Sequence, residues 1–526
     1  MAIVSDSPAL LICYMIYGKL RQKFMPQKIL LVSSSFEEVS LINASSYQKT
    51  GVKTTEVSHY PLGLAYLHAY LEPHGYEIRT LFLNNHTQED CFRKTIEKIR
   101  EFSPDIIGFQ IFTANRVSSY ALIEYIYKNY PKIKIIIGGI HATLMAEQVI
   151  EKFPFAAAVL GEGEETFLAL AEELSKEKPN LDNVDGIAFC KNNKAYRTKE
   201  RKLIENLDDL PFPKHEIFFA DKRRTSGCLV TSRGCPFNCS FCCLDSISRR
   251  RVRLRSAKNV VDEIEMMVKK FPQMKRIWIQ DDNFFIDNQR VIDICDEIIK
   301  RKIKTSFVCS ARIKPISKEM VVKLEKANFK KVLFGLESGD NGILKRCHKG
   351  ITQEDAIHAL KLFASSKKVV GTFLIVGLPG ETLETIMETA RFVKKLQKIK
   401  YFYLSEVSVL IVYPGTEVYE IAKAGGMIDD NYWLSDKPTP LFTLEHSQEE
   451  LFKFKDILLN YISLDNFFTP AGFIAQLDMI PQIARYVMGN KRILKGIVSR
   501  SMRILLPEKV FETAKRFYHL IGNKFA

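Results

Sequence analysis

Three cysteines in one short stretch are spaced closely enough to bind a single metal cluster. Cys235, Cys239 and Cys242 lie in TSRGCPFNCSFCC (231–243), so their sulfurs can converge from one loop. A structural zinc site usually takes four ligands from two separated C-x2-C pairs, and no second pair is present. Cubane iron–sulfur clusters normally take four cysteines. Three thiolates therefore predict a 4Fe-4S cluster with one iron left open, which favours catalysis over electron storage.

Polar residues and glycines recur where the next apolar runs end. A guanidinium can hold a carboxylate as a bidentate donor, and glycine lets the backbone approach a ligand closely. Each residue alone would also suit a turn or a solvated charge, and the recurrence favours a shared ligand. The residues are Asp281, Asp282, Arg312, Gly335, Glu337, Ser338, Gly377 and Gly380.

The elements that must position these residues form an alternating strand and helix pattern between residues 226 and 440. Six βα units can curve into a partial barrel of the TIM type, in which chemistry lies at the carboxyl ends of the strands. The cysteines and the polar residues all follow such ends. The expected strands are 228–232, 276–282, 305–312, 331–338, 371–377 and 401–413.

A second alternating region precedes this one, over residues 28–205. Apolar strands alternating with amphipathic helices predict a doubly wound parallel sheet, with a ligand beyond the carboxyl ends of its strands. The expected strands are 28–34, 77–83, 105–112, 132–139 and 156–163, with helices at 62–75, 88–102, 117–129 and 144–152.

The fold class is therefore α/β, with further segments around the two regions. Residues 1–27 form an N-terminal lead. Residues 206–225 form a linker, because the residues before Pro211 and Pro213 are pushed away from helix. Residues 441–526 are expected to form a helical, basic C-terminal region.

Composition limits the class of protein. The 526 residues carry a formal net charge of +15, which suits an anionic partner without selecting one. The eleven cysteines are unevenly spread, and we see neither a signal peptide nor a membrane span. We therefore expect a cytoplasmic protein in a reducing compartment.

The cluster stretch resembles that of the radical S-adenosylmethionine enzymes, whose C-x3-C-x-aromatic-C signature is matched by Cys235, Cys239, Phe241 and Cys242. The resemblance implies that S-adenosylmethionine chelates the open iron and is cleaved to a 5′-deoxyadenosyl radical. It also implies contacts to this cofactor from Phe241 and from the eight strand-end residues. Among them, Asp281 and Asp282 would serve the amino group, and Glu337 and Ser338 the ribose and carboxylate.

The N-terminal region resembles the cobalamin-binding domain of one branch of these enzymes. The resemblance is carried by HYPLGLAYLHAYLEPHGYEI (59–78), IIGGIHATLM (136–145) and LGEGEETF (160–167). No D-x-H-x-x-G follows the first strand, and His86 lacks that context, so we expect cobalamin with no protein histidine on cobalt. The implied contacts are Thr113, Asn115, Ser118, Gly138, Gly139, His141, Gly161, Glu162 and Gly163.

The branch includes methyltransferases acting on unactivated carbon, such as hopanoid methylases, and the anaerobic magnesium-porphyrin cyclase. The resemblance implies methylation of a hydrophobic or secondary-metabolite substrate, with cyclisation or another rearrangement as the alternative. A transfer-RNA methylthiotransferase would need three more cysteines near the N-terminus, where residues 28–205 hold only Cys91 and Cys190. A zinc-dependent nucleic-acid module and a simple electron carrier also fit the motifs poorly.

The family resemblance and the positive charge also indicate which partners to expect. We expect a small-molecule substrate, lipid or porphyrin-like, a reductant such as flavodoxin or ferredoxin, and no nucleic acid. SRRRVRLRS (248–256) is interpreted first as a solvated surface and second as a site that attracts an anionic electron donor or a phosphate-bearing substrate. Basic, apolar helices within 470–526 are expected either to lie on an anionic membrane or to pack as a cap.

Overall fold

The computed structural model describes residues 27–36, 60–220, 224–400 and 402–467. The chain divides into two compact units. The first holds the described residues 27–36 and 60–220 together with 430–437, and the second holds 224–400, 402–429 and 438–467. Residues 1–26 of the expected lead and residues 468–526 of the basic C-terminal region lie outside the described residues.

The first unit contains a seven-stranded sheet in the order β2-β1-β3-β4-β5-β6-β7. The first five strands of that order are parallel, as the alternating pattern predicts. The strands are β1 (Lys28–Ser33), β2 (Glu77–Phe82), β3 (Ile106–Gln110), β4 (Lys134–Gly138), β5 (Ala157–Val159), β6 (Ile187–Lys191) and β7 (Lys194–Arg197).

Helices cover both faces of this sheet because successive strand residues point to opposite sides. In β1, Ile29 and Leu31 join one core with helices α3 (Leu62–Leu71) and α8 (Glu164–Leu174). Leu30 and Val32 join the other core, with α4 (Gln88–Phe102), α5 (Arg116–Asn129) and α7 (Ala146–Lys152). Helix α6 (Ile140–Leu144) follows β4 directly. The doubly wound architecture is confirmed.

Two features of this unit go beyond the sequence expectation. Strands β6 and β7 form an antiparallel hairpin on the edge of the sheet. Its turn residues Asn192 and Asn193 have φ of 53° and 60°, the left-handed conformation that a two-residue hairpin turn requires. The stretch expected to link the domains contains a short helix, α9 (Glu216–Phe219), whose Phe218 stacks on Tyr60 at 3.7 Å between ring centroids.

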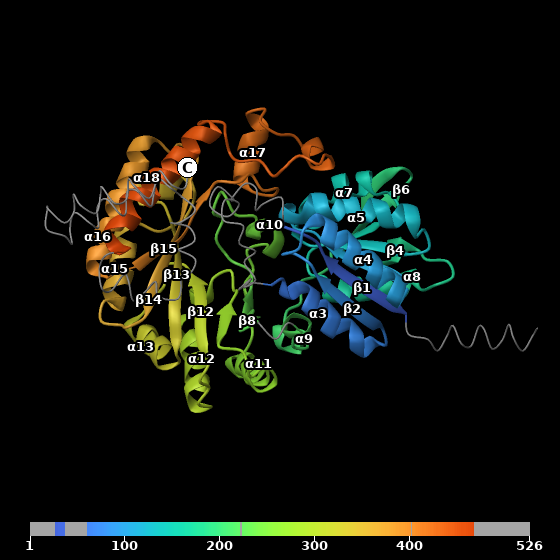
Figure 1. Cartoon of the computed structure of the whole chain (residues 1–526), viewed down its shortest axis with the longest axis horizontal. Helices are drawn as coiled ribbons and strands as arrows, with labels where there is room; N and C mark the ends of the chain where they lie inside the picture. The colour runs from blue at the N-terminus through green and yellow to red at the C-terminus, as the bar shows by residue number, and fades with distance from the viewer. Residues whose placement is uncertain (1–26, 37–59, 221–223, 401, 468–526) are drawn as a thin grey trace, which may run out of the picture. The chain divides into compact units, whose positions relative to one another are not determined.

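The second unit contains six parallel strands in sequential order, β8-β11-β12-β13-β14-β15, which is an open, partial barrel (Figure 1). The strands are β8 (Ser226–Leu229), β11 (Arg276–Ile279), β12 (Ser306–Ala311), β13 (Phe329–Glu337), β14 (Val369–Val376) and β15 (Phe402–Val409). A separate antiparallel pair joins β9 (Ser232–Arg233) to β10 (Arg253–Leu254).

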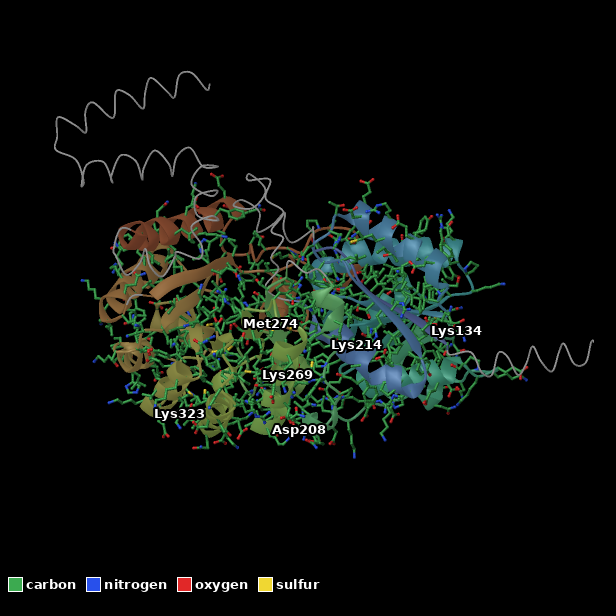
Figure 2. All side chains as sticks on the ribbon, turned by 60° about the horizontal axis from the view of Figure 1, so that its bottom comes forward. Lys134, Asp208, Lys214, Lys269, Met274 and Lys323 are labelled. Atoms are coloured by element: carbon green, nitrogen blue, oxygen red, sulfur yellow. The ribbon has the colours of Figure 1, made fainter. Side chains whose placement is uncertain are left out.

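Helices connect the barrel strands and pack beside one another along the sheet. Their polar faces carry ordinary surface ion pairs: Lys269 pairs with Glu265 on α11 (Ala257–Lys270), and Lys323 on α13 (Lys318–Lys326) pairs with Asp296 on α12 (Asn288–Lys300). Figure 2 shows where Lys269 and Lys323 lie. The helices are α10 (Leu244–Ser248), α11 (Ala257–Lys270), α12 (Asn288–Lys300), α13 (Lys318–Lys326), α14 (Asn341–Arg346), α15 (Gln353–Phe363), α16 (Leu383–Ile399), α17 (Glu417–Ala424) and α18 (Gln448–Phe467).

In the part of the chain that the structure describes, none of these helices combines the length and hydropathy that a membrane span needs.

Candidate functional site

The cysteine loop leaves β8 and turns back through the β9–β10 pair. Gly234 has φ of +93°, and a Cβ added there would collide with the backbone oxygen of Arg251, so only glycine fits this turn. The backbone N–H of Cys242 donates to the carbonyl of Cys239 at 2.9 Å, which folds the loop on itself. The three cysteines are thus brought to the carboxyl end of the first barrel strand.

Two aspartates after β11 hold this loop in place. Asp281 accepts hydrogen bonds from the backbone N–H of Thr231 at 2.6 Å, from the Thr231 hydroxyl and from the Ser232 hydroxyl. Asp282 accepts from the backbone N–H of Gly234 at 2.9 Å. Burial raises the pKa of Asp282 to about 6, and the neighbouring Asp281 adds to the rise. Both carboxylates therefore anchor the cluster loop.

The three thiols that are the candidate metal ligands are partly or fully shielded from solvent. Cys235 and Cys239 are buried and Cys242 is half-buried. Burial raises the pKa of Cys235, and raises that of Cys242 to about 12, so metal binding must displace protons. Over the described residues no group of three or more His, Cys, Asp or Glu is gathered tightly enough for one ion. A cubane carries its ligands on separate irons, and three thiols on one loop suit that larger group.

Arg312, at the end of β12, lies against the cysteine loop. Its Nη1 donates to the sulfur of Cys239 at 3.4 Å, and its guanidinium carbon lies 3.7 Å from the ring centroid of Phe237. Its Nη2 donates to the carbonyl of Lys349. The guanidinium is buried, and its Nε has no hydrogen-bond partner within the described part of the chain. The sequence assigned Arg312 to the carboxylate of S-adenosylmethionine, and that assignment remains a prediction.

The segment 347–349, just after α14, braces the loop from the other side. Its three successive carbonyls accept from the Ser240 backbone N–H at 3.0 Å, from the Cys239 thiol at 3.8 Å and from Arg312. Two of these acceptors hold the cysteine loop and the third holds Arg312, and none of them uses a side chain of the segment. The side chain of Lys349 is left available for a different contact.

That contact is a buried ion pair at the end of β13. Lys349 Nζ lies 2.7 Å from Glu337 Oε1, and both residues are less than a tenth exposed. Glu337 has φ of 65° and follows a register shift between β13 and β14. A Cβ added at Gly335 would lie 2.5 Å from Glu337 Oε1, so Gly335 leaves room for the pair.

The remaining strand-end residues of the barrel are packed into turns. The Ser338 hydroxyl meets the Thr389 hydroxyl at 3.1 Å, which also accepts from the backbone N–H of Gly339 at 2.8 Å. Gly377 and Gly380 have φ of 89° and 78°, as tight turns require. The Gly377 N–H donates to the buried carboxyl of Glu381 at 2.6 Å.

In the first unit, Thr113 and His141 meet beyond β3 and β4. His141 Nδ1 lies 3.1 Å from the Thr113 hydroxyl, and its Nε2 lies 3.2 Å from the Tyr120 hydroxyl. His141 is fully buried, and burial lowers its pKa to about 3. A neutral histidine with both nitrogens engaged is a positioning group and is not presented to a metal.

Of the other predicted cobalamin contacts, the Asn115 side chain already makes hydrogen bonds within the protein, whereas the Ser118 hydroxyl makes none among the described residues. Asn115 donates to the Gln110 carbonyl at 3.2 Å and accepts from the Phe112 N–H at 2.8 Å. The Ser118 hydroxyl is buried and has no hydrogen-bond partner in the described ranges. A buried hydroxyl beyond a strand end fits a polar ligand, as cobalamin's nucleotide tail would be.

The glycines among the predicted cobalamin contacts differ in how closely neighbouring atoms would approach an added Cβ. A Cβ on Gly139 would lie 2.6 Å from the Ile111 oxygen, so the neighbouring backbone alone demands glycine there. Gly138 and Gly161 have no such clash, and Gly161 faces open space. Glu162 Oε2 accepts from the Ile204 N–H at 2.9 Å, and a Cβ on Gly163 would approach Leu67 at 3.3 Å.

Sequence reasoning missed several residues of these sites. Lys349 was not selected because its partner Glu337 lies twelve positions away and on another element. Thr389 lies within α16, where its polar contact has no sequence signature. Arg116 and Trp433 are both fully buried, and Arg116 Nη1 donates to the Trp433 carbonyl at 3.2 Å. Only the isolated tryptophan in a polar stretch could have suggested that contact.

Comparison with known proteins gives matches for both units. A model of the B12 binding domain matches residues 48–171, and a model of the radical SAM superfamily matches residues 229–393. An uncharacterized methyltransferase of Pyrococcus horikoshii is 31% identical over 401 residues, covering 74% of this chain and 84% of that protein.

Two further comparisons concern a porphyrin enzyme and a solved structure. The anaerobic magnesium-protoporphyrin IX monomethyl ester cyclase of Rubrivivax gelatinosus is 30% identical over 345 residues, covering 64% of this chain and 62% of the cyclase. The structure of the cobalamin-dependent S-adenosylmethionine radical enzyme OxsB with aqua-cobalamin bound has a TM-score of 0.66. It is 18% identical and covers 96% of this chain and 82% of that one, so it shows the same fold.

Proposed function

The chain belongs to the cobalamin-binding radical S-adenosylmethionine enzymes, and we propose that it methylates an unactivated carbon of a hydrophobic or secondary-metabolite substrate. The observation that carries the proposal is the three-cysteine loop at the carboxyl end of β8, on a chain that also holds a B12 binding domain. The relative in Pyrococcus horikoshii is named as an uncharacterized methyltransferase, which supports the choice of reaction.

Cys235, Cys239 and Cys242 are the proposed ligands of the 4Fe-4S cluster. When bound, the cluster, S-adenosylmethionine and cobalamin supply the radical and methyl-transfer chemistry. The chain's own groups fix the loop: Asp281 and Asp282 hold its start, and segment 347–349 holds its middle. Arg312 donates to the Cys239 sulfur, and a hydrogen bond of this kind tunes a cluster's reduction potential.

The strand ends of β13 and β14 are the proposed site for the nucleoside part of S-adenosylmethionine. Glu337 offers a carboxylate for ribose hydroxyls, and the glycine turn at Gly377 lets backbone approach the adenine ring. Phe241 adds an aromatic face beside the cysteines. Asp281, Asp282, Arg312, Gly335, Ser338 and Gly380 complete the proposed surroundings of the cofactor.

The cobalamin is proposed to bind beyond β3, β4 and β5 of the first unit with no protein histidine on cobalt. Ser118 and Gly161 are the positions with free capacity, since one has a buried hydroxyl without a partner and the other faces open space. His141 holds Thr113 in place. The other proposed contacts are Asn115, Gly138, Gly139, Glu162 and Gly163.

Anaerobic reconstitution tests the proposal. The protein is purified without air, loaded with iron, sulfide and cobalamin, and incubated with dithionite and S-adenosylmethionine whose methyl group is deuterated. We expect a brown protein with bound cobalamin that forms 5′-deoxyadenosine. A metabolite pool added as substrate should gain a deuterated methyl group by mass spectrometry, and the Cys235→Ala protein should give none. A wild-type protein that binds neither iron nor cobalamin would refute the proposal.

Cyclisation without methyl transfer is the second candidate. It rests on the 30% identity to the porphyrin cyclase, although the chain spans only 62% of that protein. The same experiment separates the two reactions. Ring closure yields 5′-deoxyadenosine and a product that has lost hydrogen and gained no deuterated methyl.

Two anionic partners, a reductant and a membrane surface, are proposed from the positive charge of the protein. Arg249 and Arg250 are exposed just after α10, in the basic stretch that follows the cysteine loop, and an acidic flavodoxin or ferredoxin would be attracted there. Reduction by flavodoxin should slow as salt rises, and Arg250→Glu should slow it further at low salt. Contact of residues 470–526 with an anionic membrane surface is proposed from sequence alone, and liposome flotation of the intact chain tests it.

A further inference from the structure

The Lys349–Glu337 pair is the most deeply buried ion pair on the strand ends that carry the proposed nucleoside site. The two side chains are 7% and 9% exposed, and Nζ and Oε1 are 2.7 Å apart. A charge taken out of water must be compensated, so each side chain requires the other. Within the described residues no hydrogen bond is made to the second oxygen, Glu337 Oε2. The pair therefore fixes one carboxylate oxygen and leaves the other to a ligand.

The backbone around Glu337 is arranged to aim this side chain. Its φ of 65° is a conformation that non-glycine residues rarely adopt, and it follows a break in the β13–β14 register. Strain and bulges of this kind cluster at sites where a side chain must be redirected. Gly335 contributes by leaving empty the space that its Cβ would take from Glu337 and Lys349. A pair that served only to stabilise the fold would need neither feature.

The backbone carbonyl of Lys349 is linked to the cysteine loop through Arg312. Its carbonyl accepts from Arg312, which also donates to the Cys239 sulfur. Its Nζ lies 5.7 Å from the ring centroid of Phe241, the aromatic residue of the cysteine signature. Lys349 thus contacts Arg312, which donates to the Cys239 sulfur, through its carbonyl, and it contacts the β13 carboxylate through its ammonium.

We infer that Lys349 is a positioning residue for S-adenosylmethionine. It holds Glu337 by Oε1 so that Oε2 accepts a ribose hydroxyl, and it ties the distance between ribose and cluster to the 347–349 backbone. The inference rests on the proposed function, because it needs a nucleoside cofactor on the strand ends of the barrel. It assigns to Lys349 a role that the cysteine and glycine motifs do not include.

Ligand discrimination by the reconstituted holoprotein tests the inference. Binding of S-adenosylhomocysteine is compared with binding of analogues lacking either the 2′- or the 3′-hydroxyl, by equilibrium dialysis without air. The wild-type protein should prefer the intact ribose over at least one analogue by roughly tenfold, as expected for a hydrogen bond to a charged group. Lys349→Met should lose that preference, and Lys349→Arg should keep most of it.

Two further variants separate positioning from folding. Lys349→Met combined with Glu337→Gln leaves no uncompensated buried charge, so it should fold and bind iron while showing no preference among the ligands. Lys323→Met removes a surface lysine paired with Asp296 at 2.6 Å, and it should match the wild type in every respect (Figure 2). Thermal unfolding and iron content are measured for each protein.

Each result decides the question. A wild-type protein that binds iron and S-adenosylhomocysteine but ignores both hydroxyls overturns the inference, and so does a Lys349→Met protein with unchanged preference. An equal loss of affinity for all ligands in the neutral double variant would also overturn it, because a structural role predicts that pattern. A wild-type protein without cluster or ligand binding would instead refute the proposed function.

Discussion

At the scale of single residues, the first prediction concerns which cysteines bind iron. Only Cys235, Cys239 and Cys242 are spaced to wrap one cubane, so replacing each with Ala should abolish the cluster's visible absorbance and the formation of 5′-deoxyadenosine. Cys243 caps the start of α10, and Cys228 is buried within β8. Cys243→Ala and Cys228→Ala should therefore keep the cluster.

The contrast between adjacent cysteines is the sharpest part of this test. Iron content and absorbance are measured after anaerobic reconstitution for the Cys242→Ala and Cys243→Ala proteins side by side. A Cys243→Ala protein without a cluster, next to a Cys242→Ala protein with one, would show that the ligand assignment is wrong.

A second prediction concerns the buried carboxyl of Glu381. Burial raises its pKa from 4.5 to about 8, although the Gly377 N–H donates to it. The folded state therefore holds a proton that the unfolded chain releases near pH 4.5. This group's contribution to the free energy of unfolding should fall between about pH 4.5 and pH 8, by a few kcal/mol.

Glu381→Gln removes the titration while keeping an acceptor for the Gly377 N–H. Urea unfolding of the wild type and of the variant should therefore differ in slope against pH across that window, with the variant flatter. Glu384→Gln, on the exposed first turn of α16, is the matched control and should follow the wild type. Parallel curves for wild type and Glu381→Gln would contradict the assignment.

At the scale of elements, the strands were predictable wherever apolar runs alternate with amphipathic helices. The run 28–34 became β1, and the helix expected at 88–102 is α4 with the same bounds. The β6–β7 hairpin was missed because its strands are short and half-exposed, and only Asn192-Asn193 signals the turn. Strand ends were predictable, whereas the partners of side chains on them, such as Lys349 for Glu337, depend on tertiary packing.

The start of α6 carries the third prediction. His141, the second residue of this helix, is fully buried with its nitrogens against Thr113 and Tyr120, and burial lowers its pKa to about 3. Such a ring cannot reach cobalt without breaking both contacts. Electron paramagnetic resonance of the cob(II)alamin form should show no nitrogen hyperfine coupling from a lower axial ligand.

Variants at the two candidate histidines check this result. His141→Phe should leave the resonance spectrum unchanged while weakening cobalamin binding, because Thr113 loses its partner. His86→Ala should change neither. Nitrogen splitting in the wild type that disappears in either variant would contradict the prediction.

At the scale of the whole molecule, each compact unit is built from separate segments of the chain. Residues 430–437, which we call the strap, belong to the first unit although the flanking residues belong to the second. The strap's Trp433 is fully buried, with its ring 5.6 Å from that of His141 and 5.2 Å from the Arg116 guanidinium. Arg116 also donates to the strap's carbonyls at Trp433 and Lys437. The cobalamin-binding unit is therefore completed by residues that follow the barrel in sequence.

The last prediction follows from that arrangement. Trp433→Ala should remove about 3–5 kcal/mol from the stability of the first unit, the usual cost of emptying a buried aromatic site. Amide hydrogen exchange should then quicken in β3 and β4, the strands that lead to Arg116 and His141 in sequence, and stay unchanged in β12 of the barrel. Asp436→Ala, at an exposed position of the same strap, should alter neither strand. Exchange that quickens equally in β12, or that stays slow in β3, would mean that the strap does not stabilise the cobalamin-binding unit, because a local contact must protect its own unit first.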